Sequence, residues 1–567
     1  MNELPTIVPY DPDEAPSGKR RGRIADGWNL AVIVISLLAV LPVGALLWKA
    51  TGDTSGIWQH LLQNVLPQSA GVTAILLVGV GISVFLTGSI TAWLVNRYDF
   101  PLRGFVRWGL VLPLAIPTYL AAYTYTEFLD FTGPVQTLVR AAGGFQSARD
   151  YWFPDIRSTT GAILLLGVVL FPYVYLPASL SFGMQGRSMI DVARVLGAGP
   201  FKLFWRVAVP AARPAITVGV MLAMMETLND IGAVEHLGVR TLTFSVFDTW
   251  LNRSSLAGAA QISLMLLLVV ALLVHVERRM RRERAFSDSR HKPEMEAPIR
   301  LRGIRAYVAS AICLAPIIFG FVIPAGQMIA FVQTDPGQIL QSGLGQAAWH
   351  SVMVAASTAL VCVITGFVIV YGRRRSPGSL FTIAGRFTGF GYAVPGTILA
   401  IGVLTACSGF DNSLDSFMRN SFGISTGLLI SGSIAVLVYA SSIRFLAIAA
   451  GNIEAGYEKI SHNLAAAART LGRTEMKVLK EIDLPLLKRA FGTAALIVTV
   501  DTMKELSATL MLRPFNFNTL ATYVYERASR AVFEEAAFAA LLIVLIGLVP
   551  VYMLTRFSDS GLVQKKR

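Results

Sequence analysis

Four acidic residues stand out because they form two equally spaced pairs within strongly apolar stretches. Glu226 and Asp230 are four residues apart, and Asp501 and Glu505 repeat that spacing late in the chain. Residues four apart in a helix share a face, and Lys504 is placed to neutralise one of the acids. Ionisable groups at membrane depth cost roughly 2.5–3.5 kcal/mol each on insertion scales, so they need a function or a partner.

Two interpretations of these charges are open. Such groups can line a polar pathway, or a gate near its outer end, at the seam between two halves of the protein. They can equally form a buried hydrogen-bonded network that only locks the halves together. The candidate pathway or gate residues are Glu226, Asn229, Asp230, Asp501, Lys504 and Glu505.

Other reactive side chains are not arranged for catalysis or metal binding. The six histidines are scattered without metal-ligand spacing, and the three cysteines lie in apolar runs. We therefore expect no catalytic residues, no metal site and no cofactor in this chain. The sequence has no Gly-x-x-x-x-Gly-Lys-Ser/Thr loop, so ATP would have to be bound by a partner. Tyr119, Tyr123 and Tyr125 are expected to form an interfacial aromatic belt, with contact to a hard cation as the alternative.

The composition indicates the surroundings in which these residues are placed. Of the 567 residues, 54% are hydrophobic and only 15% are charged, whereas a soluble chain carries about 25% charged residues. This balance excludes a soluble enzyme, a disordered protein and a secreted disulfide scaffold. The net charge of +14 lies in short clusters between apolar stretches, which is typical of membrane topology signals and not of nucleic-acid binding. The predicted fold class is an all-α membrane protein.

Twelve apolar stretches are long enough, at about 20 residues each, to cross a bilayer. They fall near residues 29–49, 70–95, 108–128, 160–183, 211–234, 257–276, 305–332, 348–371, 381–408, 424–450, 487–511 and 535–555. Lys and Arg concentrate in alternate loops, which predicts that both termini are cytoplasmic. In this assignment Arg444 lies at the cytoplasmic end of the tenth helix.

A polar, basic stretch in the middle of the chain separates the spans into two sets of six. The predicted organisation is a cytoplasmic N-terminal tail (1–28), a first transmembrane half (29–277), a cytoplasmic linker (278–304), a second transmembrane half (305–557) and a cytoplasmic tail (558–567).

An internal repeat relates the two halves at a constant sequence offset. The segment Ala193–Gly197 reads ARVLG and the segment Ala468–Gly472 reads ARTLG. The offset that aligns these segments also pairs the first acid pair described above with the second. A register without gaps through loop and helix alike predicts two homologous six-helix units in parallel orientation.

Each copy of the repeat contains a segment that should bend on the cytoplasmic face. Gly197 and Gly472 each follow a short helical segment, and glycine suits the left-handed position after a helix end. A second short amphipathic helix follows, and a proline at the same distance from the glycine in both copies, Pro210 or Pro485, is expected to end it. The result is a helix–turn–helix elbow, which is either a pair of interfacial helices or a docking element.

The elbows resemble the EAA loop of ABC importer permeases, which reads Glu-Ala-Ala-x-x-x-Gly, nine variable residues and Ile-x-Leu-Pro. The matching residues are Asp191, Ala193, Gly197 and Pro210 in the first copy and Ala466, Ala468, Gly472 and Pro485 in the second. Both copies lack the leading Glu, and the second has lost the acid altogether. Around residues 225–232 and 503–521 the chain resembles the fused, two-half permeases of ferric-iron importers.

This resemblance implies a type I ABC importer permease fold and a transport subunit that is not an enzyme. It implies a translocation pathway for iron(III) in the bacterial inner membrane, with two copies of a cytoplasmic ABC ATPase on the elbows and a periplasmic substrate-binding protein. Related fused permeases carry thiamine, polyamines or phosphonates, which are the alternative cargoes. An ion-coupled secondary transporter with parallel repeats is the alternative of a different class. The bilayer is a further partner, and nucleic acid is not expected to be one.

Overall fold

The computed structural model describes residues 27–52, 56–185, 187–287, 298–334, 336–337, 343–375 and 391–563. The predicted N-terminal tail up to residue 26, residues 288–297 of the predicted linker, residues 381–390 of the predicted ninth span and residues 564–567 of the predicted C-terminal tail lie outside the described residues. Nearly all regular structure in the described part is helical, which confirms the predicted all-α class.

The first half contains a series of long helices joined by shorter ones. Its helices are α1 (Gly27–Ala50), α2 (Ile57–His60), α3 (Leu66–Arg97), α4 (Arg103–Gly109), α5 (Thr118–Leu129), α6 (Pro134–Gly143), α7 (Thr159–Leu170), α8 (Pro172–Met184), α9 (Arg187–Val195), α10 (Pro200–Leu203), α11 (Val209–Asn229), α12 (Gly232–His236), α13 (Leu242–Leu251) and α14 (Leu256–Ser287). Single turns of π-helix at Leu61–Val65 (η1) and Phe204–Ala208 (η3) and of 3-10 helix at Leu112–Ala115 (η2) complete it.

The second half follows the same plan. Its helices are α15 (Ile304–Ile317), α16 (Ile323–Thr334), α17 (Leu344–Arg375), α19 (Gly396–Phe422), α20 (Ile434–Glu458), α21 (His462–Thr470), α22 (Glu475–Val478), α23 (Leu484–Lys504), α24 (Ser507–Leu512), α25 (Leu520–Ser529) and α26 (Ala537–Val563). The short turns are η4 (Ile318–Val322), η6 (Leu479–Asp483) and η7 (Phe533–Ala536). Two strands, β1 (Tyr98–Asp99) and β2 (Ile299–Arg300), pair in parallel and tie the end of α3 to the start of the second half.

Membrane-spanning character agrees with the predicted spans. In the described part, nine helices are long and apolar enough to cross a membrane, and two bent helix pairs bring the number to eleven. α23 occupies the place of the remaining predicted span and is 21 residues long. Unlike an uninterrupted apolar span, it carries four charged residues, namely Lys488, Arg489, Asp501 and Lys504.

Two of the predicted spans are bent rather than straight. Helix Arg103–Ala115 meets helix Thr118–Gly143 at 94°, and α7 meets α8 at 43°. A proline follows each break, Pro117 in the first case and Pro172 in the second, and proline cannot supply the N–H that would continue the preceding helix. The predicted edges of the ninth to eleventh spans also shift, because α19 runs to Phe422 and α23 already ends at Lys504.

The internal repeat is present in the structure with the register that the sequence predicts. Four consecutive elements, α9, α10, η3 and α11, recur as α21, α22, η6 and α23, with every boundary displaced by the same sequence offset. Even the π-helical turn before the long helix occurs in both copies. The two halves are therefore structural homologues in this region.

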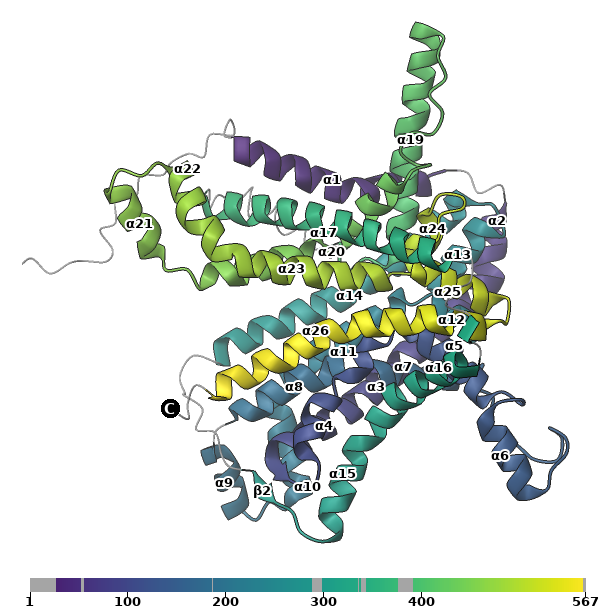
Figure 1. Cartoon of the computed structure of the whole chain (residues 1–567), viewed down its shortest axis with the longest axis vertical. Helices are drawn as coiled ribbons and strands as arrows, with labels where there is room; N and C mark the ends of the chain where they lie inside the picture. Colours follow the sequence, from purple (N-terminus) through teal and green to yellow (C-terminus); the bar gives the residue numbers. More distant parts are fainter. Residues whose placement is uncertain are drawn as a thin grey trace, which may run out of the picture.

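The halves are interlocked, because the first helix of each packs against the other half. α1 lies along α17 and α19, whereas α15 lies against α3 and α4 (Figure 1). Hydrogen bonds also join the two halves: Tyr439 of α20 donates to the carbonyl oxygen of Leu38 in α1 at 2.6 Å, and Ser310 of α15 donates to that of Pro101, just before α4, at 2.8 Å. The segments 29–277 and 305–557 are thus contiguous in sequence but exchange an element in space.

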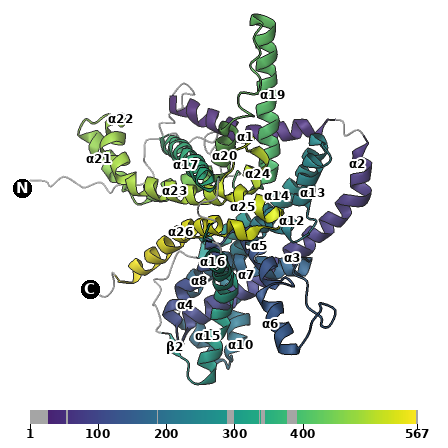
Figure 2. The ribbon, with the colours of Figure 1, turned by 45° about the vertical axis from the view of Figure 1, so that its right-hand side comes forward.

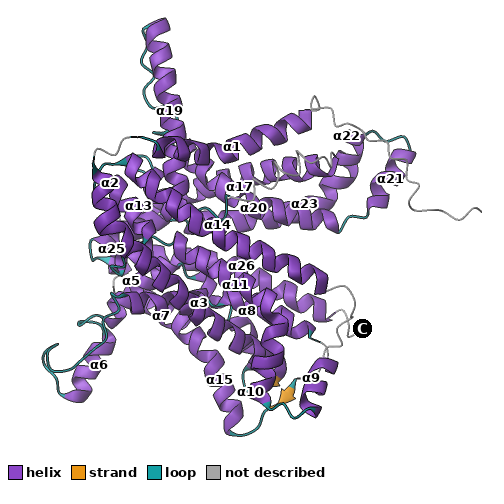
Figure 3. Ribbon diagram, turned by 180° about the vertical axis from the view of Figure 1, so that it is seen from behind, coloured by secondary structure: helices purple, strands orange, loops and turns teal. Residues whose placement is uncertain are grey.

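Both elbows lie at the same end of the molecule. α9 and α10 of the first copy, and α21 and α22 of the second, are found where α1 begins and α26 ends (Figures 1 and 3). The short helices α12, α13 and α25 lie at the opposite end. Near that end α6 and the far part of α19 project from the bundle in opposite directions (Figure 2).

Candidate functional site

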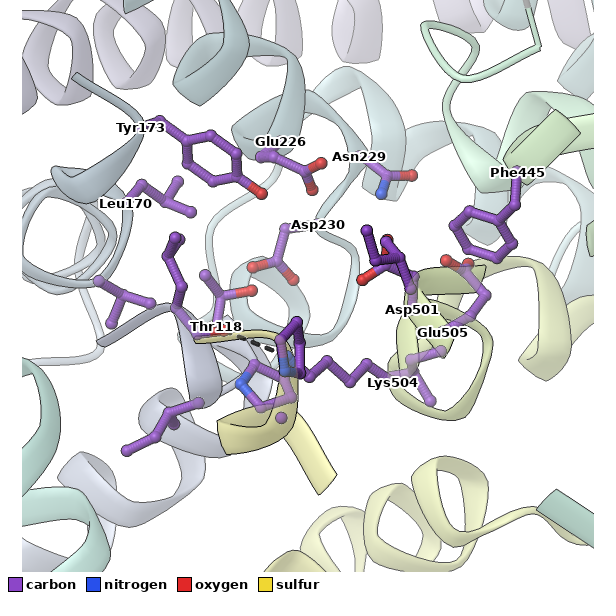
Figure 4. A pocket seen from close by; sticks show the side chains of 18 of the residues that line it. Thr118, Leu170, Tyr173, Glu226, Asn229, Asp230, Phe445, Asp501, Lys504 and Glu505 are labelled. Atoms are coloured by element: carbon purple, nitrogen blue, oxygen red, sulfur yellow. Dashed lines mark hydrogen bonds between the residues drawn. The ribbon is translucent and has the colours of Figure 1, made fainter. Parts of the chain in front are cut away.

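A cavity of about 500 Å³ lies at the seam between the two halves. Its lining comes from η2, α5, α7, α8 and α11 of the first half and from α20, α23 and α26 of the second. Figure 4 shows Glu226 and Asp230 on one side of this space and Asp501 and Glu505 on the other. All six residues predicted from spacing line the cavity: Glu226, Asn229, Asp230, Asp501, Lys504 and Glu505.

The later acid of each pair has a structural partner. α11 and α23 end at Asn229 and Lys504, and the chain then turns into α12 or α24. Asp230 accepts a hydrogen bond from the backbone N–H of Ala233 at 2.9 Å, and Glu505 accepts one from Ala508 at 2.9 Å. Both carboxylates therefore satisfy an N–H at the start of a short helix, where an acid is favourable.

An arginine side chain that the sequence analysis placed wrongly also lines the cavity. Arg444 was predicted at the cytoplasmic end of a span, but it lies near the middle of α20 with only 6% of its side chain exposed. Its Nη1 lies 3.3 Å from Oε1 of Glu505 and donates to Oδ1 of Asn229 at 2.9 Å. The prediction was wrong because α20 continues to Glu458, about two turns beyond the apolar run. The repeat offset indicates that Arg444 lies within a span, since it aligns this residue with Val169, which is inside a span of the first half.

Asn229 connects the two halves through both its side chain and its backbone. Its Oδ1 accepts from the N–H of Gly396 at 2.8 Å, and its carbonyl oxygen accepts from the hydroxyl of Ser507 at 2.8 Å. A Cβ on Gly396 would lie 2.5 Å from Nη1 of Arg444 and 2.9 Å from Oε1 of Glu505. Glycine at this helix start therefore allows α19 to approach the ion pair closely, and a larger residue would displace the two charged side chains.

Lys504 reaches across the seam instead of turning back along its own helix. Its ammonium donates to the carbonyl oxygen of Leu114 in η2 at 3.2 Å. A Cβ on Gly547 of α26 would lie 2.8 Å from this nitrogen, so the lysine side chain is held in a narrow space. Sequence reasoning also missed Tyr392, whose hydroxyl donates to Oε1 of Glu226 at 3.3 Å.

The two halves are in contact on the side away from the elbows, where α12 and α24 begin. A Cβ on Gly232, the first residue of α12, would lie 2.6 Å from Cδ2 of Leu506, the residue before α24. In the other direction the cavity lining continues along α23 to Thr493. Thr493 and Lys504 are three helical turns apart in α23, which is roughly 16 Å along the helix. The cavity therefore extends from the acidic residues toward the elbow end.

The tyrosines of α5 do not form an interfacial belt. Tyr119 and Tyr123 are 4% and 1% exposed, and Tyr125 donates to the carbonyl oxygen of Phe319. Tyr123 packs edge-on against His236 of α12, with ring centroids 4.6 Å apart. Burial lowers the pKa of His236 to about 4, so this imidazole is neutral near pH 7. The belt prediction was wrong because α5 follows the 94° bend into the core.

The two elbows have the same backbone geometry. Gly197 and Gly472 have φ of 81° and 80°, the left-handed conformation that their sequence position predicts. The N–H of the residue after each glycine bonds to the carbonyl oxygen of Ala193 or Ala468, at 3.0 Å in both cases. Such a bond is part of the capping pattern of helices that end on a left-handed glycine.

The prolines of the elbows do not end a helix, contrary to the prediction. The chain from Pro200 to Asn229 forms one continuous helical span, and Pro210 is the second residue of α11, which follows the π-helical turn η3. Pro485 has the same position after η6. The wider π turn accommodates a residue without an N–H, so the short helix continues into the membrane helix.

Apolar side chains are exposed at matching positions of the elbows. Leu196 is 80% exposed, and Leu471, its counterpart in the second copy, is 82% exposed. Phe201 and Met476 form a second matching pair at 75% and 49%. Of the remaining motif positions, Asp191 and Ala193 are half-buried, Ala466 is exposed and Ala468 is buried, while Pro210 and Pro485 are exposed.

Comparisons with known proteins agree with this architecture. Residues 84–282 match the family described as binding-protein-dependent transport system inner membrane component. The chain is 24% identical over 549 residues to the Fe(3+)-transport system permease protein FbpB 2 of Haemophilus influenzae, covering 94% of this chain and 98% of that protein.

Shorter relatives match about one half of the chain. The sulfate transport system permease protein CysT of Synechocystis is 26% identical over 265 residues, which are 44% of this chain and 90% of that protein. The molybdenum transport system permease protein ModB of Escherichia coli is 28% identical over 210 residues, 35% of this chain and 87% of that protein. Residues 84–282 therefore belong to the family of binding-protein-dependent transport system inner membrane components, and the chain, with its two repeated halves, resembles an Fe(3+)-transport permease over nearly its whole length.

Proposed function

We propose that this permease forms the translocation pathway for iron(III) in an ATP-driven importer. The observation that carries the proposal is the cavity between the halves, which is lined by four carboxylates and only two basic residues. An excess of acidic groups favours a cationic cargo over a free oxyanion such as sulfate or molybdate. The relative that aligns along nearly the whole chain is named as an iron(III) permease, and this supports the same cargo here.

Glu226 and Asp501 are the proposed cargo-facing acids. They lie one helical turn before Asp230 and Glu505, whose carboxylates are already engaged by backbone N–H groups. Asn229, Arg444 and Lys504 are proposed to hold the two halves together on the side of the cavity away from the elbows, since each bonds across the seam.

The elbows are the proposed seats of two copies of a cytoplasmic ABC ATPase. The matched exposed residues Leu196 and Leu471 offer each copy an equivalent apolar contact, and the glycine turns hold both in the same geometry. ATP would be hydrolysed by these partners, and a periplasmic binding protein would deliver the cargo. In this proposal the elbows, the linker 278–304 and the tails 1–28 and 558–567 are on the cytoplasmic side of the bacterial inner membrane.

The test is ATP-dependent uptake into proteoliposomes that contain the full chain, the ATPase and the binding protein. Iron(III), sulfate, thiamine and spermidine are offered in parallel, with ATPase-free vesicles as the control. We expect accumulation of iron(III) only, and only with ATP. Accumulation of sulfate, thiamine or spermidine in place of iron(III) would refute the cargo assignment, and uptake without the ATPase would refute the ATP-driven mechanism.

A further inference from the structure

A second concave site, separate from the central cavity, lies on the outer surface of the first half. It is a groove of about 590 Å³ between α3 and α11. Its walls are apolar, with Val78, Ile82 and Phe85 from α3 and Ile216, Val220 and Met224 from α11 among them. Val78 and Ile82 are more than half exposed. Because both helices belong to candidate membrane spans and the groove is open at the surface, we expect it to face the hydrocarbon of the bilayer.

One charged residue lines the groove, and it lies at the end of the groove nearer to the elbow. Arg213 is the fifth residue of α11 and is exposed, whereas Met224 marks the other end of the groove on the same helix. The three helical turns between them correspond to roughly 16 Å along the helix. The hydrocarbon core of a bilayer is about 30 Å thick, so the apolar part of the groove matches the depth of one leaflet.

In the second half, aromatic side chains pack together at the position that corresponds to Ile216. Phe491, which corresponds to Ile216 at the repeat offset, packs edge-on against Phe367 of α17 with centroids 5.5 Å apart. Trp28 of α1 packs in turn against Phe367 and Tyr371. α1 therefore covers the second half around Phe491, whereas Ile216 lines an open groove in the first half.

We propose that the groove between α3 and α11 is a specific site for an anionic phospholipid of the leaflet on the elbow side. An acyl chain would occupy the apolar groove, and the guanidinium of Arg213 would bind the headgroup phosphate. Guanidinium groups bind phosphate through paired hydrogen bonds, and basic residues between membrane helices on the cytoplasmic side are suited to anionic lipids. This inference does not depend on the identity of the transported cargo.

The site has a direct mechanical connection to the elbow and to the cavity. α11 forms the wall of the groove, continues at one end into the first elbow, and carries Glu226 and Asn229 at the other end. A Cβ on Gly81 of α3 would lie 2.5 Å from Cε of Met224. The two walls of the groove are therefore in close contact at the end that is farther from the elbow. A bound lipid would thus be wedged beside the helix that links the elbow to the acids.

The test measures lipid retention by the purified full-length protein with native mass spectrometry. The probes are phosphatidylglycerol and phosphatidylcholine with identical acyl chains, added at equal concentration. We expect the wild-type protein to retain one phosphatidylglycerol in preference to phosphatidylcholine. Arg213→Gln should reduce this preference about tenfold, the scale of a lost charge-assisted hydrogen bond.

Two further variants separate the proposal from ordinary lipid adhesion. Lys488→Gln is the matched control, because Lys488 occupies the position of Arg213 in the second copy, and it should leave retention unchanged. Val220→Trp, which fills the groove while keeping Arg213, should reduce retention of both lipids. The proposal is overturned if Arg213→Gln and Lys488→Gln have equal effects, or if Val220→Trp retains phosphatidylglycerol at the wild-type level.

Discussion

Arg444 and Glu505 form an ion pair at a depth where an unpaired charge is costly. Each side chain is 6% exposed, and Arg444 also donates a hydrogen bond to Oδ1 of Asn229. Removing one partner of a buried pair leaves the other charge uncompensated, typically at a cost of about 3–5 kcal/mol. We expect Arg444→Met to lower the stability of the detergent-solubilised protein by that amount, as measured by its denaturant unfolding midpoint.

The double variant provides the control for this prediction. Arg444→Met combined with Glu505→Gln removes both charges, so it should recover most of the lost stability. If the double variant is no more stable than Arg444→Met alone, the destabilisation arises from lost packing and not from an unpaired carboxylate.

Glu226 and Asp501 should matter for transport more than for assembly. Glu226→Gln and Asp501→Asn keep the side-chain volume and remove the charge that faces the cavity. We expect each variant to lower the rate of iron(III) uptake by at least about tenfold while the protein purifies as a monodisperse species.

Glu534→Gln is the control for this pair, because Glu534 is an exposed acid in η7 outside the cavity lining. It should transport at the wild-type rate. Uptake at the wild-type rate by both cavity variants would contradict the pathway role of Glu226 and Asp501. Their remaining role would be structural, as members of the buried polar network.

The residue types in the cavity were only partly predictable. The two acid pairs could be found because the repeat preserves their spacing, and symmetry then brings both to the seam. Tyr392 could not be found in this way, and the spacing of the acids does not point to Arg444, although the repeat offset aligns Arg444 with Val169 inside a span. The role of Gly396 depends on the approach of α19 to a charged pair from two other helices, which no local pattern encodes.

At the scale of elements, the elbows depend on two left-handed glycines. Gly197 and Gly472 have φ near 80°, and a β-branched residue in that conformation costs roughly 1–2 kcal/mol or more. We expect Gly197→Val and Gly472→Val to distort the elbow, so that ATP hydrolysis continues with little uptake. The ratio of iron(III) transported to ATP hydrolysed, measured in proteoliposomes, tests this coupling.

The first elbow contains its own control glycine. Gly199 lies two residues after Gly197 with φ −65° and ψ 167°, a conformation open to any residue, and the second copy has Thr474 at its position. Gly199→Thr should therefore retain coupling. Equal coupling in Gly197→Val and Gly199→Thr would show that the turn conformation is not what the ATPase requires.

Element identity was easier to predict than element shape. Apolar length placed the spans, and the positive φ at both glycines follows from their position after a helix end. The 94° bend before α5 and the continuous passage through Pro210 both involve proline, yet with opposite outcomes. Whether a proline breaks a helix depends on how neighbouring turns widen to accept it, and that depends on tertiary packing.

At the scale of the whole molecule, the two halves exchange their first helices. α1 covers α17 and α19, and α15 covers α3 and α4, so neither half buries its apolar surface alone. The sequence predicts six spans per half but contains no signal for this exchange. The apolar pattern of a helix is the same whether it packs against its own half or against the other half. Two of the relatives align over most of their own length with less than half of this chain, so one half has the length of a separate permease protein.

The exchange leads to a prediction about a divided protein. When residues 1–290 and 291–567 are produced together as separate chains, we expect them to assemble, because the reciprocal contacts do not need the linker. The complex should co-purify through a tag on either chain and transport iron(III). Either chain produced alone should aggregate or be degraded, since it lacks the helix that covers its bundle.

A truncation distinguishes exchange from simple side-by-side association. Removing residues 1–50 from the first chain deletes α1, whose partners are α14 of its own half and α17 and α19 of the other. This truncation should weaken co-purification and expose α17 and α19 to proteolysis, while α3 and α8, which pack against each other, stay protected. If α17 and α19 resist proteolysis without α1, the first helices lie on the surface of the bundles and do not hold the two halves together.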